Sequence, residues 1–186
     1  MKKLLTVILF AFFVIEISAQ NPYINVDSIE LAIKETNSDE GCLKHKNTVR
    51  NAAVFYLNTP APSKKLNDPV IQLKRSTSLL LVMQWAEHTS EVVLSLDNDM
   101  LNGILVGGNK GYELTSAYIA ATVVYVIENH VDKITKDAYI YAMEETLRYY
   151  TQNKKVIGKS NPLEKLLVLS EEKRAQELAE RYKNDL

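Results

Sequence analysis

Apolar residues recur every three or four positions through most of the chain, which is the spacing of an amphipathic helix. The first such segment begins near Asp27, where Asp27 and Glu30 have the spacing of a capping box. A second helix is expected with Ser38 as its N-cap and its end near Asn58. The opening part of the chain after residue 20 is therefore predicted to form two helices.

The clearest helix start is the dipeptide Asp68-Pro69, because aspartate suits the N-cap and proline suits the first helical position. The run 79–86 is apolar on nearly every side, so this third helix is expected to be buried on most sides. A shorter helix is expected over 97–106, ended by the glycines at 107–108.

The segment 112–129 contains β-branched residues that also suit a strand, especially over 123–127. It is too long for an ordinary strand, and no partner strand is visible in the sequence, so we interpret it as a central buried helix. Thr135 is the expected cap of the next helix, which reaches about Gln152, and the two form a predicted antiparallel hairpin.

Two further helices are expected, one starting at Asn161 and one capped by Ser170, and Glu177 and Arg181 have the spacing of an ion pair on the last helix. The pattern thus predicts an all-α fold, a single-domain bundle of seven or eight helices with orthogonal or hairpin-stacked packing. We assign this domain to residues 20–186.

Residues 1–19 have the pattern of a secretory signal peptide. Two lysines precede an apolar run from Leu4 to Ile15, and a small residue, Ala19, stands before Gln20. Cleavage between Ala19 and Gln20 is expected, since the apolar run is shorter than the roughly 20 residues that a membrane-spanning helix needs. The leader suits a bacterial envelope protein that is periplasmic or extracellular, with no membrane span in the mature chain.

The balance of charge excludes some partners. The chain has 22 basic and 23 acidic residues and a net charge of −1. A nucleic-acid-binding domain normally carries a strong basic stripe, so nucleic acid is not an expected partner. The single cysteine, Cys42, leaves no intramolecular disulfide to hold the fold.

Three groups of residues invite a chemical interpretation. The glycines at 103, 107, 108 and 111 lack the spacing of a phosphate-binding loop. The histidines at 45, 88 and 130 are too widely spaced to suggest a metal site. Asp39, Cys42 and His45 share one helix face and contain the residue types of a thiol nucleophile with its base. We expect no cofactor and no metal, and name no catalytic residue.

Tyr141, Glu144 and Arg148 line up on the polar side of the helix that follows Thr135, and tyrosine and arginine are enriched where proteins make contact. They are our candidate partner-contact face. The sequence favours a non-enzymatic binding protein of the cell envelope, such as an adaptor, an inhibitor or an immunity-type protein, whose partner is another envelope protein. The alternatives are a small exported hydrolase with a dispersed site, or a helical pocket for an apolar ligand between 79–86 and 117–127.

Overall fold

The computed structural model describes residues 24–63, 68–92 and 109–184. These ranges contain eight helices and no β-strand, so the all-α prediction is confirmed. The predicted signal peptide, its cleavage site at Ala19 and Gln20, and the expected helix at 97–106 lie outside the described residues. No described helix is long and apolar enough to cross a membrane.

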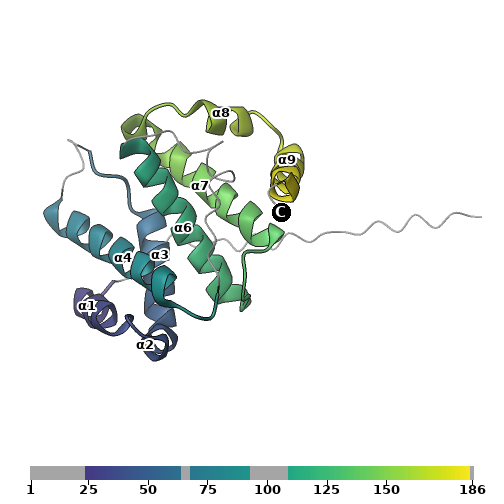
Figure 1. The fold of residues 1–186 in the computed structure, drawn as a ribbon. Coiled ribbons are helices and arrows are strands. Elements are labelled where there is room, and N and C mark those ends of the chain that lie inside the picture. The colour runs from purple at the N-terminus through teal and green to yellow at the C-terminus, as the bar shows by residue number, and fades with distance from the viewer. Residues whose placement is uncertain (1–23, 64–67, 93–108, 185–186) are drawn as a thin grey trace, which may run out of the picture.

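The helices are arranged around α6 (Figure 1). Their bounds are α1 Val26–Glu35, α2 Asp39–Lys44, α3 Lys46–Asn58, α4 Pro69–His88, α6 Asn109–Asn129, α7 Lys136–Ile157, α8 Asn161–Leu167 and α9 Glu171–Asn184. The predicted hairpin of α6 and α7 forms the most extensive contact, and α3 and α4 pack on the other side of α6. The second helix of the hairpin is longer than expected, since α7 continues beyond Gln152 to Ile157.

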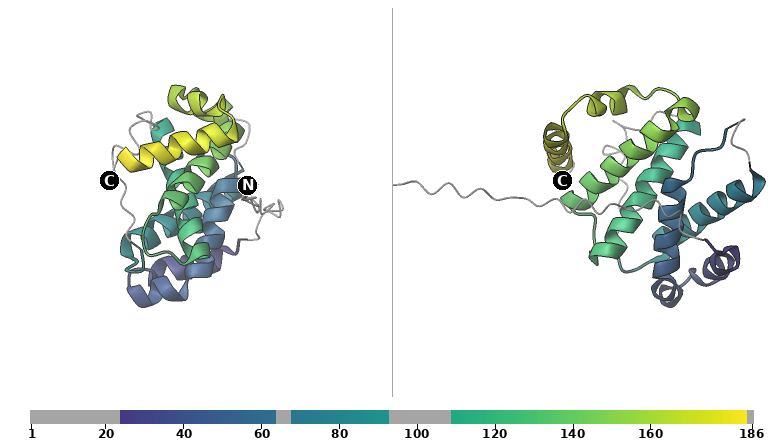
Figure 2. Two further views of the ribbon diagram at one scale, coloured as in Figure 1. Left: turned by 90° about the vertical axis from the view of Figure 1, so that its right-hand side faces the viewer. Right: turned by 180° about the vertical axis from the view of Figure 1, so that it is seen from behind.

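The two outer layers come from the ends of the described chain. Helix α1 packs on α4 and α3, and α9 packs on α7 (Figure 2). The last helix is mostly polar, and its buried anchor is Leu178, which is fully excluded from solvent. The expected pair of Glu177 and Arg181 is present on its outer side at 2.9 Å.

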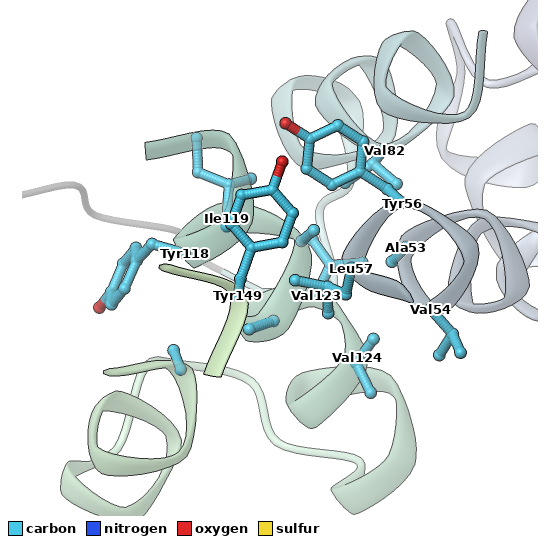
Figure 3. Packing of buried hydrophobic residues seen from close by; sticks show 14 of the residues in the cluster. Ala53, Val54, Tyr56, Leu57, Val82, Tyr118, Ile119, Val123, Val124 and Tyr149 are labelled. Carbon is cyan, nitrogen blue, oxygen red and sulfur yellow. The ribbon is translucent and has the colours of Figure 1, made fainter. Parts of the chain in front are cut away.

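The core lies where α3, α4, α6 and α7 meet. Small and β-branched side chains fill it, and two tyrosines, Tyr56 and Tyr149, lie among them with their rings stacked at a centroid distance of 5.9 Å (Figure 3). The side chain of Trp85 is also buried, and its indole N–H donates to the carbonyl oxygen of Cys42 at 3.1 Å. The central position predicted for 112–129 is confirmed, because α6 contacts helices on both of its sides.

Local signals locate most helix starts. Asp68 accepts hydrogen bonds from the amides of Val70 and Ile71, and the hydroxyl of Thr135 accepts one from Ala138, as the sequence predicts. The hydroxyl of Ser38 likewise caps α2. The left-handed φ of 83° at Gly158 ends α7, a conformation that glycine adopts without a steric cost.

Two local predictions are wrong. The cap of α1 is Asn25, whose side chain accepts from the amide of Asp27, so Asp27 lies inside the helix. The single helix expected after Ser38 is two helices, because the chain turns a corner at His45. The prediction that the run 79–86 is buried on most sides is confirmed, with one exception: Leu80 is 54% exposed on the outer side of α4.

Candidate functional site

The side chains of Asp39, Cys42 and His45 do not form a catalytic group. Cys42 is 1% exposed and its thiol donates to the carbonyl oxygen of Thr36 at 3.5 Å. Burial, with a smaller effect from the Asp39 carboxylate, raises the pKa of this thiol. The imidazole of His45 is instead 2.5 Å from the carboxylate of Glu35. The three residues are close in the sequence, but in the structure each side chain contacts a different partner.

The Asp39 carboxylate accepts a hydrogen bond from the amide of Ser90, which lies just beyond the end of α4. This contact ties the start of α2 to that segment. Within the described ranges, no three His, Cys, Asp or Glu side chains gather as metal ligands would. The contacts of Asp39, Cys42 and His45 thus join α2 to α1 and to the segment after α4.

The predicted contact face on α7 is divided among neighbouring elements. Tyr141 is half-buried, with its ring 5.3 Å from that of Tyr125. Glu144 pairs with Arg174 of α9 at 2.6 Å. Arg148 pairs with Glu145 at 2.7 Å and also donates to the side chain of Asn58 on α3. The role of Tyr141, Glu144 and Arg148 in partner binding stays a prediction.

The most developed polar cluster joins four helices inside the core. The Arg75 guanidinium of α4 lies 2.5 Å from the Glu113 carboxylate of α6 and donates to the Tyr149 hydroxyl of α7, also at 2.5 Å. Tyr149 in turn donates to Glu113 at 2.7 Å. Tyr56 of α3 donates to the same carboxylate at 3.2 Å, and its ring lies 4.2 Å below the guanidinium carbon.

This cluster is almost excluded from solvent, since Arg75 is 5% exposed and both tyrosines are fully buried. Burial raises the pKa of the Tyr149 hydroxyl well above its usual value, so the group stays protonated and serves as a donor. The two hydroxyls point to the same place between the helices (Figure 3). Within the described residues the buried Nε of Arg75 has no hydrogen-bond partner, but its two terminal nitrogens and both tyrosine hydroxyls converge on the Glu113 carboxylate. We therefore interpret the cluster as a link between α3, α4, α6 and α7.

Sequence reasoning did not single out Arg75 or Glu113. The sequence does contain an indication that Arg75 is buried. Arg75 lies four positions before Leu79 and seven before Val82, and both of these residues are buried on the same side of α4. Glu113 similarly precedes the buried Ala117 by four positions on α6. A charged residue on an apolar helix stripe predicts a buried pair, although it does not identify the partner.

Among the described helices, α4 carries the largest group of exposed apolar side chains, and they lie on its outer side. Val70 is 60% exposed, Leu73 59% and Leu80 54%. Ser76 and Thr77 lie between them, and both hydroxyls bond to the carbonyl oxygen of Leu73, at 3.0 and 2.7 Å. We call these five residues the α4 outer face. The hydroxyl donors of Ser76 and Thr77 are occupied within the helix, so the exposed side chains that remain available for contact on this face are mainly apolar.

Helix α4 lies at the edge of the molecule in both the front and back views (Figures 1 and 2).

Comparisons with protein-family models, with curated proteins and with solved structures gave no match to the chain. The interpretation of its function therefore depends on the geometry of its own residues.

Proposed function

We propose that the protein is an exported helical protein of the bacterial cell envelope that acts by binding another envelope protein, as an adaptor, an inhibitor or an immunity-type protein does. The leader pattern of residues 1–19 supports export. The α4 outer face supports binding, and it is the observation that carries the proposal, because exposed apolar side chains gathered on one side of a helix are a feature of interaction sites.

The size of the face bounds the strength of the contact. Full burial of a valine or leucine side chain contributes about 1.5–3 kcal/mol. Val70, Leu73 and Leu80 are each a little more than half exposed, so covering them completely would add about 3–5 kcal/mol in total. Micromolar binding needs about 8 kcal/mol. The partner must therefore also contact surface beside the face.

An amphipathic helix of another protein is the occupant that fits best. Leu80 lies ten positions after Val70 on α4, about 15 Å along the helix, which is the length over which a docked helix places its apolar anchors. Acidic side chains, Asp68 and Glu87, stand exposed at the two ends of α4. Two copies of the chain pairing through this face would bring these like charges together, whereas a partner helix with basic flanks would complement them.

The test compares three forms of the chain that begins at Gln20. Leu73→Glu combined with Leu80→Glu places two charges on the face, and Val168→Glu is the matched control, because Val168 is an apolar residue that is 82% exposed elsewhere. Each form is used to capture proteins from the native envelope, and the captured protein is then purified and titrated against it. We expect binding by the wild type and the control, and loss of binding by the double variant.

Equal binding by the double variant, with an unchanged circular dichroism spectrum, would rule out the α4 outer face. Sedimentation analysis of the purified chain tests the alternative occupant. A dimer that the double variant abolishes would show that a second copy covers the face. Export is checked separately by mass spectrometry of the protein from its native host, where the expected first residue is Gln20.

A further inference from the structure

Positive charge is concentrated at one end of the molecule. Residues 150–169, which form the last turns of α7 and all of α8, contain four lysines and one acidic residue. The whole chain has a net charge of −1 and this stretch has +3, so the remaining residues carry −4. The end of α7 and α8 lie together on the side of the molecule opposite α1 and α2 (Figures 1 and 2). The nearly neutral chain therefore has one basic end, which we call the α7–α8 end.

Contacts between side chains hold α8 against the last turns of α7. The Tyr150 hydroxyl of α7 donates to the Glu164 carboxylate of α8 at 2.6 Å and accepts from the amide of Ser160 at 2.9 Å. The Lys154 ammonium lies 2.6 Å from the same carboxylate. Helix α8 is thus fixed on α7, and the single acidic side chain of this end is already paired.

The other three lysines of the α7–α8 end are uncompensated. Lys155, Lys159 and Lys165 are exposed, and none of them forms an ion pair with any of the described residues. Two exposed valines lie among them in the sequence. Val156 is 42% exposed, and Val168 is 82% exposed, the highest value among the exposed apolar side chains of the described chain. Positive charge and apolar surface are therefore presented together.

The outer side of α8 combines both features. Leu163 and Leu166 are buried on its inner side, whereas Lys165 and Val168, three positions apart, are exposed on the opposite side. The helix dipole favours a lysine near the end of a helix, but it gives no reason for the exposure of Val168. Lysines beside an exposed apolar side chain are typical of surfaces that lie against lipid headgroups, because the charges contact phosphates while the apolar group enters the boundary of the acyl chains.

We propose that the α7–α8 end binds the surface of an anionic phospholipid bilayer, with its three unpaired lysines at the headgroup phosphates and Val168 at the boundary of the acyl chains. Two exposed valines are too few for the core of a protein interface, which buries about 800 Å² on each partner. A bilayer, by contrast, supplies a continuous apolar phase of its own. The negative charge of the remaining chain is repelled by the same membrane, which turns the basic end toward it. This surface is separate from the α4 outer face and does not depend on the proposed protein partner.

The experiment sediments the chain that begins at Gln20 with vesicles at low salt. One set of vesicles contains equal parts of phosphatidylglycerol and phosphatidylcholine, and the other contains phosphatidylcholine alone. Each lysine near an anionic surface strengthens binding about fivefold, so we expect binding to the anionic vesicles to be stronger by on the order of 100-fold. Without an acyl chain the binding should be weaker than that of a myristoyl anchor, so lipid is titrated to about 20 mM. Salt at about 1 M should abolish the binding.

Two triple variants test where the charge must lie. Lys155→Gln, Lys159→Gln and Lys165→Gln together should reduce binding to the anionic vesicles by on the order of 100-fold. The matched control removes the same charge from three exposed lysines away from the α7–α8 end, by the substitutions Lys34→Gln, Lys133→Gln and Lys136→Gln. This control should retain binding, because the net charge of the two variants is the same and only its location differs.

Val168→Glu should weaken binding to the anionic vesicles at least about tenfold, since it removes the most exposed apolar side chain and adds a negative charge. Leu73→Glu combined with Leu80→Glu, which alters the α4 outer face, should retain vesicle binding, so the two proposals fail independently. No binding at about 20 mM anionic lipid, equal binding to both kinds of vesicle, or equal losses in the two triple variants would each overturn the proposal. Binding to soluble polyglutamate as tight as to the anionic vesicles would overturn it in favour of an acidic protein partner.

Discussion

Replacing Arg75 with methionine tests whether the buried cluster links the helices of the core. The variant removes the 2.5 Å ion pair to Glu113, the hydrogen bond to Tyr149 and the contact of the guanidinium with the Tyr56 ring, while it keeps a side chain of similar length. Breaking a buried pair by removing one partner costs about 3–5 kcal/mol, because the other charge remains buried.

The structure places Arg75→Met at the lower end of that range. The side chain of Glu113 is 19% exposed, so water can reach part of the unpaired carboxylate. We expect a loss of about 3 kcal/mol in the free energy of unfolding. For a chain of this length the melting temperature would fall by about 6–12 °C. Glu113→Leu should cost at least as much, since it leaves the guanidinium of Arg75 without its partner, and the side chain of Arg75 is only 6% exposed.

The double variant separates a specific pair from a general loss of packing. With both charges removed, the remaining cost comes mainly from Tyr56 and Tyr149, whose buried hydroxyls lose their shared acceptor, at about 1–3 kcal/mol each. Arg75→Met combined with Glu113→Leu leaves no unpaired buried charge, so it should be more stable than Glu113→Leu alone, and its cost should be well below the sum of the two single costs. The assay is urea unfolding followed by far-ultraviolet circular dichroism. Additive costs in the double variant, or a loss below about 1 kcal/mol in Arg75→Met, would refute the reasoning.

Three further predictions concern the corner formed by α1, α2 and α3. Gly41→Ala should destabilise the protein by more than about 2 kcal/mol in the same unfolding assay, because an added Cβ would lie 1.8 Å from the carbonyl oxygen of Glu35. An unchanged urea midpoint of unfolding would contradict this close approach. Native Cys42 should resist iodoacetamide at neutral pH and react only after unfolding, as mass spectrometry would show, since it is buried and its thiol pKa is raised; rapid labelling of the folded chain would disagree. Hydrogen bonds from Lys44, and to a smaller extent from His45, hold the pKa of the Glu35 carboxylate below its usual value. The stability that this carboxylate contributes is therefore fully present above its unfolded pKa of about 4.3, and it is lost as the pH falls through the lower pKa of the folded state. Glu35→Gln should flatten the dependence of the unfolding midpoint on pH in that acidic range, and an unaltered slope would exclude this pair as its source.

The sequence by itself determined the class of fold and most helix starts. The caps at Ser38, Asp68 and Thr135 were predictable because the bonds that they make reach only two or three residues along the chain. The interpretation of 112–129 as a helix was also a local inference, since its length alone excludes an ordinary strand. The leader, likewise read from local composition, stays a prediction.

Tertiary structure decided everything that depends on contacts between distant segments. The turn of the chain at His45 is stabilised by a contact with Glu35, ten positions earlier. Helical periodicity in the sequence could not predict this contact, because the two residues lie on different helices. Arg75 and Glu113 are separated by 38 positions, so periodicity could suggest that each is buried but not that they meet. The exposure of Leu80 also depends on contacts between distant segments. An apolar residue is buried only if another element covers its side of the helix, and the position of that element is set by packing of the whole chain rather than by its neighbours in sequence.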